Sequence, residues 1–263
     1  MKKVVSIILS VISLCLLFSG CSGNNSKISE IKDRGTLRVG VKSDVMNFGY
    51  MSSETGEYEG LEIDIAKEFA KVITGDEKNI SFEAVTAATR DTLLNNNNID
   101  MIIATFTITE ERKNTHNFSQ PYYTDEIGFL VKKDSNIKSS NDMGGKLLGV
   151  TLSSTAYNEF GENSTFSSST KPVRKEFANY PEVKNALLTG QIDIFAADKS
   201  ILYGYLDEST VLLDEGFKSQ PYGIATKLDD KSFAKYIDKH LAEMKDKGTL
   251  EEILNRWITT NGK

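Results

Sequence analysis

The stretch Ile99–Arg112 constrains the fold of this chain most tightly. Its apolar run, Met101–Ala104, is bounded by polar residues, which is typical of a strand buried on both faces of a sheet. Thr109 is a good N-cap and two glutamates follow it, so we predict that a helix begins there with Arg112 in its first turn. In open α/β sheets, ligands bind beyond the carboxyl ends of the strands, so this junction is a candidate carboxylate site or an ordinary strand–helix turn.

The rest of the chain continues this alternation of strands and helices. The order strand, helix, strand, helix, strand before Pro121 is typical of a doubly wound α/β sheet. Residues 163–170 are rich in serine and threonine, which predicts a loop. The periodicity predicts strands at 37–41, 80–85, 127–131, 147–151, 173–177, 192–197 and 222–226, and helices at 61–73, 181–188 and 231–257.

An internal repeat predicts that the chain forms two similar α/β lobes. The pair Ile99-Asp100, followed by a strand ending at Thr105, recurs as Ile192-Asp193, followed by a strand ending at Asp198. If the two lobes face one another, hydroxyls and Arg112 on one side lie opposite a carboxylate on the other. A ligand that carries both a carboxylate and an ammonium group fits between them. The alternative is that Asp198 only caps the helix that follows it.

The first 20 residues have the pattern of a signal peptide. Lys2 and Lys3 precede an apolar run over 4–18, and Cys21 follows two small residues, as in a bacterial lipobox. Phe18 stands where leucine is usual in that motif. We predict cleavage before Cys21, lipidation of this cysteine, a lipid-anchored tether over 21–27, and a location on the outer face of the cell membrane. Cleavage removes Cys15 and leaves a single cysteine, which excludes an intramolecular disulfide.

Charge and motif content argue against several functional classes. A net charge of −6 disfavours nucleic acid as a partner. The two histidines, His116 and His240, are far apart and expected at the surface, and no cluster has metal-ligand spacing. Ser153-Ser154 lacks a glycine-flanked nucleophile elbow, and Gly144-Gly145-Lys146 lacks the upstream glycine of a phosphate loop. We therefore expect no cofactor, no metal and no catalysis.

Two further cations bear on the charge of the ligand. Lys42 ends the first predicted strand, and Arg90 follows the second, so both face the edge of the sheet that carries Arg112. Together with Asp198, these three cations give the site a net charge of about +2. An unpaired buried guanidinium is costly, so the count favours a ligand with a second carboxylate.

The alternative is that neighbouring acids neutralise Lys42 and Arg90, so that neither cation is available to the ligand. Asp44 lies two residues after Lys42, and Asp91 directly follows Arg90. If these acids pair with the cations at the surface, the preference for an acidic ligand is lost.

Six segments, taken in this order, carry a family resemblance. They resemble the amino-acid-binding family of ABC-transporter substrate-binding proteins (bacterial extracellular solute-binding protein family 3), and within it the members that bind aspartate or glutamate. The resemblance covers residues 35–257. The segments are GTLRVGV (35–41), GLEIDIAKEFA (60–70), IDMIIATFTITEER (99–112), NFSQPYY (117–123), QIDIFAAD (191–198) and PYGIATK (221–227).

The resemblance implies a fold and assigns roles to single residues. It implies two doubly wound α/β lobes joined by two hinge strands, of the type II periplasmic-binding-protein kind, with lobe 1 over 28–124 plus 229–263 and lobe 2 over 128–225. Arg112, Thr105 and Thr107 would hold the α-carboxylate of the ligand. Thr155 would reach the same carboxylate from lobe 2, and Asp198 would hold the α-ammonium.

The same resemblance implies a function without chemistry. Lys42 and Arg90 would meet the side-chain carboxylate of an acidic L-amino acid, aspartate or glutamate. The chain would be a monomeric, lipid-anchored component of an ABC importer that delivers this ligand to the permease and ATPase subunits. Ala87 stands where many relatives carry an aromatic residue, and its presence argues against a basic amino acid as the ligand. The alternatives are glutamine or another polar amino acid, with Arg90 pointing away, a surface adhesin or sensor, and a dehydratase-like or lyase-like enzyme.

Overall fold

The computed structural model describes residues 26–161 and 171–258. The predicted signal peptide, Cys21 and the predicted loop at 163–170 lie outside these residues. Ser26 and Lys27, the last residues of the predicted tether, cap and begin helix α2 (Lys27–Arg34). In the described part of the chain, no helix is both long enough and apolar enough to cross a bilayer.

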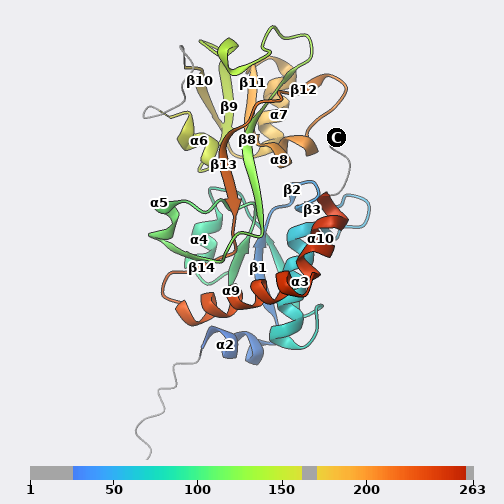
Figure 1. Cartoon of the computed structure of the whole chain (residues 1–263), viewed down its shortest axis with the longest axis vertical. Coiled ribbons are helices and arrows are strands. Elements are labelled where there is room, and N and C mark those ends of the chain that lie inside the picture. The colour runs from blue at the N-terminus through green and yellow to red at the C-terminus, as the bar shows by residue number, and fades with distance from the viewer. Residues whose placement is uncertain (1–25, 162–170, 259–263) are drawn as a thin grey trace, which may run out of the picture.

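Two separate sheets divide the molecule into an upper and a lower part (Figure 1). We call the part around the first sheet lobe 1 and the part around the second sheet lobe 2. The first sheet has the order β5 (Ile80–Ala84), β1 (Leu37–Val41), β6 (Met101–Ile103), β14 (Ala225–Lys227) and β7 (His116–Phe118). The second has the order β10 (Val173–Phe177), β9 (Leu147–Thr151), β11 (Ile194–Asp198), β8 (Tyr123–Lys132) and β12 (Thr210–Leu212).

The two sheets share one arrangement, as the internal repeat predicts. In lobe 1, β1 is parallel to both β5 and β6, and β14 is antiparallel to β6. In lobe 2, β9 is parallel to both β10 and β11, and β8 is antiparallel to β11. The strands that precede Thr105 and contain Asp198 therefore occupy equivalent places in the two sheets.

In each lobe, the repeated aspartate lies in the turn before one strand and accepts a hydrogen bond from the backbone at the start of a neighbouring strand. The carboxylate of Asp100 accepts a hydrogen bond of 2.9 Å from the backbone N–H of Arg38, at the start of β1. The carboxylate of Asp193 accepts one of 2.8 Å from the backbone N–H of Leu147, at the start of β9. In both lobes this bond fixes the register of the central parallel pair.

The repeated isoleucines pack on glycines of the same central strands. A Cβ added to Gly40 would lie 2.5 Å from the Cδ1 atom of Ile99, and one added to Gly149 would lie 2.4 Å from that of Ile192. Real Cβ contacts of this length do not occur, so each glycine makes room for its isoleucine. The Ile-Asp repeat is therefore a packing and pairing device that both lobes use.

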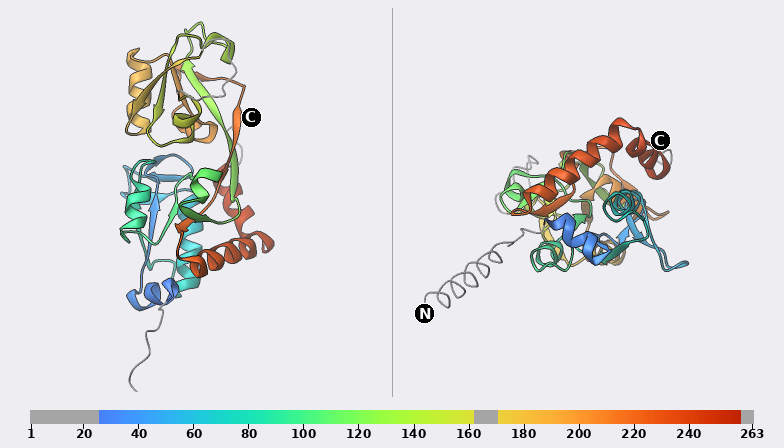
Figure 2. Two further views of the ribbon diagram at one scale, coloured as in Figure 1. Left: turned by 90° about the vertical axis from the view of Figure 1, so that its left-hand side faces the viewer. Right: turned by 90° about the horizontal axis from the view of Figure 1, so that it is seen from below.

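Two long strands connect the lobes. Strands β8 and β13 (Phe217–Tyr222) are antiparallel partners and run side by side between the upper and lower parts (Figures 1 and 2). The single strand predicted over 222–226 is wrong, because β13 ends at Tyr222 and β14 begins only at Ala225. Gly223, between them, donates its backbone N–H to the carbonyl of Phe106 at 3.0 Å.

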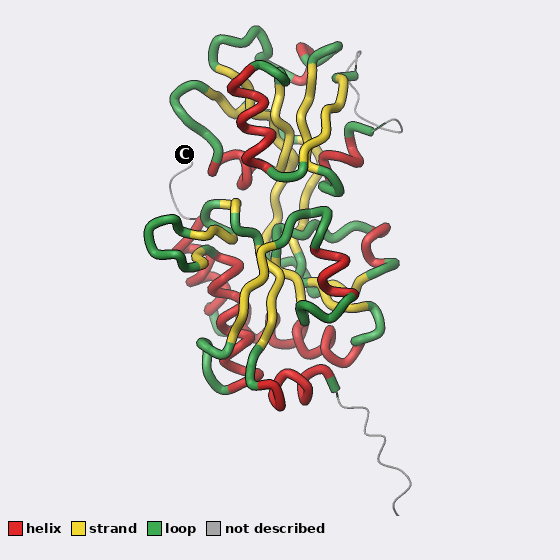
Figure 3. Tube along the Cα trace, turned by 180° about the vertical axis from the view of Figure 1, so that it is seen from behind, coloured by secondary structure: helices red, strands yellow, loops and turns green. Residues whose placement is uncertain are grey.

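Helices flank the strands in each lobe (Figure 3). The helix predicted over 231–257 is two helices, since Gly248 adopts a φ of +79° that ends the first of them. A small third sheet, β2 (Asp44–Val45), β3 (Gly49–Met51) and β4 (Tyr58–Glu59), was not predicted. The remaining helices are α3 (Leu61–Thr74), α4 (Arg90–Asn95), α5 (Glu110–Lys113), α6 (Thr155–Glu159), α7 (Tyr180–Thr189), α8 (Lys199–Gly204), α9 (Lys231–Asp246) and α10 (Thr249–Ile258).

Candidate functional site

A narrow cavity lies between the two lobes. Six of the seven predicted ligand residues line it, and Lys42 does not. The lining residues are Ala87, Arg90, Thr105, Thr107, Arg112, Ser154, Thr155, Ala156, Tyr180, Ala197 and Asp198.

Thr105 and Thr107 follow β6 at the edge of the first sheet. Thr105 has a φ of +43°, which is unusual for a β-branched residue and needs support from its surroundings. That support is a hydrogen bond of 2.6 Å from its backbone N–H to the carboxylate of Glu62. The hydroxyl of Thr107 donates to the side-chain oxygen of Gln220 at 2.8 Å. Both threonines are therefore held in place by residues distant in the sequence.

Arg112 lies in the short helix α5. As predicted, Thr109 is the N-cap of this helix, and its side chain accepts a hydrogen bond of 3.2 Å from the backbone N–H of Arg112. Its guanidinium donates to the carbonyl of Thr107 at 2.8 Å. It also donates across the cavity to the carbonyl of Ser153 in lobe 2, at 3.1 Å. The guanidinium of Arg112 thus connects the two lobes.

Phe106 supports two of the site cations, and sequence reasoning missed it. The guanidinium carbon of Arg90 lies 3.5 Å from the centre of the Phe106 ring, and that of Arg112 lies 4.8 Å from it. Burial and the nearby charge of Arg112 lower the pKa of Arg90 to about 9. Arg90 therefore remains charged at neutral pH and faces the cavity.

Asp198 ends β11 on the opposite wall. Its carboxylate accepts a hydrogen bond of 2.6 Å from the hydroxyl of Tyr222, and it makes no capping bond to helix α8. The capping alternative for Asp198 is therefore wrong. Burial, and then the charge of Asp125, raise the pKa of Asp198 to about 7. A cation placed beside this carboxylate would relieve the cost of its ionised form.

Lobe 2 contributes a second missed residue, Tyr180. It begins helix α7, is almost fully buried, and lines the cavity near Thr155, which begins α6. In the sequence Tyr180 has no signal beyond its position before Pro181, where an aromatic residue is ordinary. Its place in the site depends on the closure of lobe 2 against lobe 1.

The structure does not bring Lys42 into the cavity. Its ammonium lies 3.0 Å from the carboxylate of Asp44 and 4.9 Å from the centre of the Tyr180 ring. Asp44 thus neutralises Lys42, as the alternative predicts, although Lys42 is buried and Asp44 is half-buried. Asp91 neutralises Arg90 only weakly, because its side chain is half exposed and its carboxylate lies 4.0 Å from the guanidinium. Without Lys42 the net charge of the cavity falls from about +2 to about +1.

Glu62 is a third residue that sequence reasoning missed. It lies in the first turn of α3 and is fully buried. Its carboxylate accepts hydrogen bonds from the backbone of Thr105 and from the hydroxyl of Tyr122. Burial raises the pKa of Glu62 to about 7, against the lowering effect of these two bonds. An acid in the first turn of an amphipathic helix is so common that the sequence carries no signal for this role.

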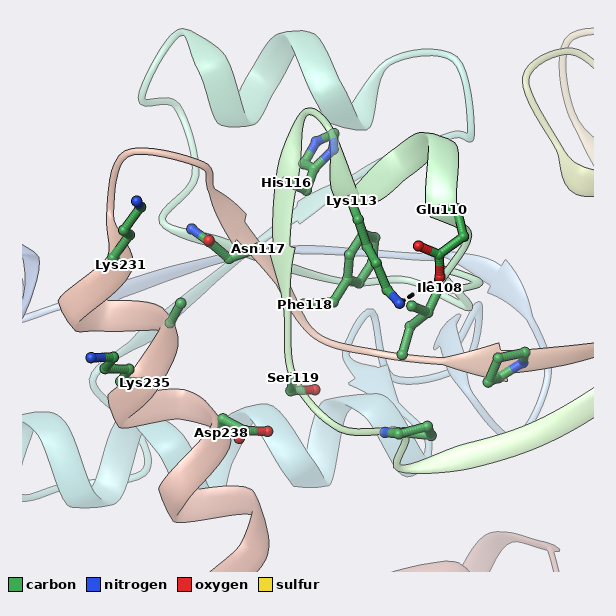
Figure 4. Close-up of a pocket in the computed structure, with 13 residues that line it drawn as sticks. Ile108, Glu110, Lys113, His116, Asn117, Phe118, Ser119, Lys231, Lys235 and Asp238 are labelled. Carbon is green, nitrogen blue, oxygen red and sulfur yellow. Dashed lines mark hydrogen bonds and ion pairs between the residues drawn. The ribbon is translucent and has the colours of Figure 1, made fainter.

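A larger, more open groove lies on the outside of lobe 1, between helix α9 and strand β7 (Figure 4). None of the seven predicted ligand residues lines it. His116 does, and the prediction that this histidine lies at the surface is wrong. Its side chain is buried against the ring of Phe106, with ring centres 5.4 Å apart. In the described residues, no group of three or more His, Cys, Asp or Glu is arranged to hold a metal ion.

Comparison with known proteins places the chain among solute-binding proteins. The family of bacterial extracellular solute-binding proteins, family 3, matches residues 37–260. The chain is 40% identical over 273 residues to the ABC transporter glutamine-binding protein GlnH of Bacillus subtilis (strain 168), with 98% of each chain covered. It is also 40% identical over 226 residues to a glutamine-binding protein of Geobacillus stearothermophilus, with 82% of each covered.

A solved structure supports the same fold. The crystal structure of a cysteine-binding protein from Campylobacter jejuni superimposes with a TM-score of 0.83 at 27% identity, covering 90% of this chain and 96% of that one. The prediction of two α/β lobes of the type II periplasmic-binding kind is confirmed.

Proposed function

Because the chain belongs to family 3 of the bacterial extracellular solute-binding proteins, we propose that it captures an amino acid between its lobes and delivers it to an ABC importer. The observation that carries the proposal is the cavity with Arg112 on one wall and Asp198 on the other. A guanidinium and a carboxylate on facing walls are complementary to the carboxylate and ammonium of an α-amino acid.

The ligand that we propose is glutamine, the alternative to an acidic amino acid. Lys42 is paired with Asp44 outside the cavity, so one of the two cations expected to hold a second carboxylate is already neutralised. Two relatives that are 40% identical to the chain are glutamine-binding proteins. A side-chain amide adds hydrogen-bonding groups to the ligand without adding charge.

Glutamate or aspartate is the second candidate. The observation that favours it is Arg90, which is buried, charged and part of the cavity wall. A side-chain carboxylate of the ligand could pair with this guanidinium.

The proposed capture is a movement of lobes and not a reaction. Thr105, Thr107 and Arg112 would receive the ligand, and Thr155 and Asp198 would complete the cage as lobe 2 turns about β8 and β13. We propose lobe 1 over 28–124 plus 229–263 and lobe 2 over 128–225, except that β14, which includes Ala225, belongs to lobe 1 because it pairs with β6 and β7. A lipid on Cys21 would keep the monomeric protein beside the permease on the outer face of the membrane.

Isothermal titration calorimetry of the purified protein with each protein amino acid, near pH 8, tests the proposal. We expect glutamine to bind with micromolar or higher affinity, about −8 kcal/mol, and glutamate at least about tenfold more weakly. Tighter binding of glutamate or aspartate than of glutamine would show that the ligand is an acidic amino acid. If no amino acid binds, the proposed function fails, and chemical change of the recovered ligand would indicate an enzyme.

A further inference from the structure

We infer that Asp125 and Tyr222 are positioning residues, which together keep the carboxylate of Asp198 free to face a ligand. Asp125 makes the capping bond of helix α8 that Asp198 would otherwise make, and Tyr222 holds one oxygen of Asp198. The inference rests on the proposed function, because it concerns how the proposed partner of the α-ammonium is presented to the cavity.

Asp198 occupies the N-cap position of α8 but does not cap this helix. Its φ of −64° and ψ of 141° are the extended backbone angles that an N-cap residue usually has, and aspartate is among the best capping residues. Its side chain nevertheless makes no capping bond and instead lines the cavity. The first N–H groups of α8 therefore need another partner, since they have none within the helix.

Asp125 of strand β8 supplies that partner. One oxygen of its carboxylate accepts the backbone N–H of Ser200, the second residue of α8, at 2.9 Å. The register of the sheet explains the contact. Asp198 lies opposite Ile127 on β8, and the same register carried two residues further sets Ser200 opposite Asp125. The other oxygen accepts the backbone N–H of Glu126 at 2.8 Å, so both oxygens of the Asp125 carboxylate are held.

Tyr222, at the end of β13, holds the carboxylate of Asp198. The residue is fully buried, and its hydroxyl donates to one oxygen of Asp198 at 2.6 Å. The same hydroxyl lies 3.3 Å from the carboxylate of Asp125, so it is close to both acids. A carboxylate accepts hydrogen bonds with two oxygens, and the second oxygen of Asp198 therefore remains for an ammonium group.

The two positioning residues lie in the two strands that connect the lobes. Strand β8 carries Asp125 and β13 carries Tyr222, and these strands pair directly, with Tyr222 opposite Tyr123. The backbone of Tyr222 also forms a bridge with that of Thr107, on the proposed carboxylate side of the cavity. The connecting strands therefore join the proposed ammonium partner to the proposed carboxylate site.

Without Asp125, the cap of α8 would compete with the ligand for Asp198. The N–H of Ser200 would lose its partner, and Asp198 already has the backbone angles of an N-cap, so its side chain would turn to the helix. A ligand would then have to break the new capping bond before its ammonium could pair with Asp198. The affinity for any α-amino acid should therefore fall, whatever its side chain.

The decisive experiment measures glutamine binding by calorimetry, near pH 8, in Asp125→Ala and Asp125→Asn. Alanine cannot cap, so we expect the affinity to fall at least about fivefold. Asparagine caps as well as aspartate but carries no charge, so its affinity should stay within about twofold of the parent. Glutamate carries the same ammonium, and its affinity should change by similar factors. An unchanged affinity in Asp125→Ala, or an equal loss in both variants, would overturn the inference.

A second background tests whether Asp125 acts through Asp198. In Asp198→Asn, the carboxylate that would turn away from the ligand is already absent, so adding Asp125→Ala should change the glutamine affinity by less than about twofold. A further fivefold loss, about as large as in the parent, would contradict the inference, because the effect would then bypass Asp198.

Glu126→Ala is the matched control. It removes a neighbouring carboxylate of β8, which pairs with Lys199 of the same helix and accepts no bond from Ser200. Its glutamine affinity should stay within about twofold of the parent. A loss as large as that in Asp125→Ala would mean that removal of any acid from this strand weakens binding, and the capping role would then be rejected.

Tyr222→Phe decides the matter if Asp125→Ala does not fold. It removes the bond to Asp198 but keeps the ring, so the glutamine affinity should fall about threefold in the parent and less than about twofold in Asp198→Asn. Equal falls in the two backgrounds, or none in either, would overturn the inference while leaving the proposed function intact. If the unmodified protein binds no amino acid, the proposed function fails, and the role of Asp125 and Tyr222 fails with it.

Discussion

The hydroxyl of Tyr205 in lobe 2 donates a hydrogen bond of 2.8 Å to the backbone carbonyl of Asp44 in lobe 1. The carboxylate of the same Asp44 pairs with Lys42, whose ammonium lies over the ring of Tyr180 in lobe 2. The Lys42–Asp44 pair is thus part of a contact between the lobes, outside the cavity. We therefore expect the pair to affect ligand binding only through the closed arrangement of the lobes.

Tyr205→Phe tests this contact. The variant removes one hydrogen bond between the lobes, worth about 1 kcal/mol, and leaves the cavity unchanged. We expect the affinities for glutamine and glutamate to fall by the same factor of about five, because only the closed state is weakened. Calorimetry with both ligands measures this. Tyr203→Phe, an exposed neighbour on α8, is the control, and a change in the ratio of affinities would contradict the prediction.

Arg112→Ala should weaken binding of every amino acid. The substitution deletes the proposed partner of the α-carboxylate and the hydrogen bond to the carbonyl of Ser153 in lobe 2. Loss of a buried charged partner costs about 2–5 kcal/mol, which takes a micromolar dissociation constant to between about 30 μM and about 5 mM. Lys113→Ala is the matched control, since Lys113 is exposed on the same helix and pairs with Glu110 of that helix. Unchanged affinity in Arg112→Ala would show that the carboxylate is held elsewhere.

Asp198→Asn should weaken binding but stabilise the ligand-free protein at high pH. The pKa of Asp198 is raised to about 7 in the folded protein, so folding favours its protonated form. This favourable contribution is complete below the ordinary aspartate pKa near 4 and is lost as the pH rises through about 7. The variant cannot ionise, so its gain in melting temperature over the parent should be larger near pH 8 than near pH 5.

The binding arm of the same experiment uses glutamine. Without a carboxylate for the α-ammonium, we expect the affinity to fall by at least about thirtyfold, or 2 kcal/mol. Affinity for glutamine in the parent should itself decline below pH 7 as Asp198 becomes protonated. Equal affinity of parent and variant near pH 8 would exclude Asp198 as the ammonium partner.

The sequence predicts those parts of the site that depend on local pattern. Thr105 and Asp198 lie at the ends of equivalent strands in two separate sheets, and the internal repeat predicts that these ends meet where the two lobes face one another. Glu62 and Phe106 were not predicted, because each acts on a partner that only the fold brings near. Glu62 is 43 residues from Thr105 and 60 from Tyr122.

The fold shows the same division between local and distant information. Strand β1 was predicted at its observed limits, since Leu37, Val39 and Val41 alternate with polar or small residues. Strands β2, β3 and β4 are two or three residues long, too short to show a period, and they form through pairing with one another. Lys42 was expected at the cavity but does not line it, because its ammonium pairs with the carboxylate of Asp44, two residues away.

The repeated contact between isoleucine and glycine gives the last prediction. In Gly149→Ala, the new Cβ would lie 2.4 Å from Cδ1 of Ile192 and 2.9 Å from Cγ1 of Val183, both fully or nearly buried. Overpacking of this kind costs about 1–3 kcal/mol. We expect a lower denaturation midpoint in urea with an unchanged slope.

Ile192→Val supplies the second arm of the test, because it removes the methyl group that would clash with the new Cβ. The single variant Ile192→Val should cost about 0.5–1.5 kcal/mol by itself. Combined with Gly149→Ala it should cost less than the sum of the two single variants, since each change relieves the other. The same pair in lobe 1, Gly40→Ala with Ile99→Val, should couple with the same sign. If the free-energy costs are additive in both lobes, the contact between isoleucine and glycine is not what requires a glycine at these positions.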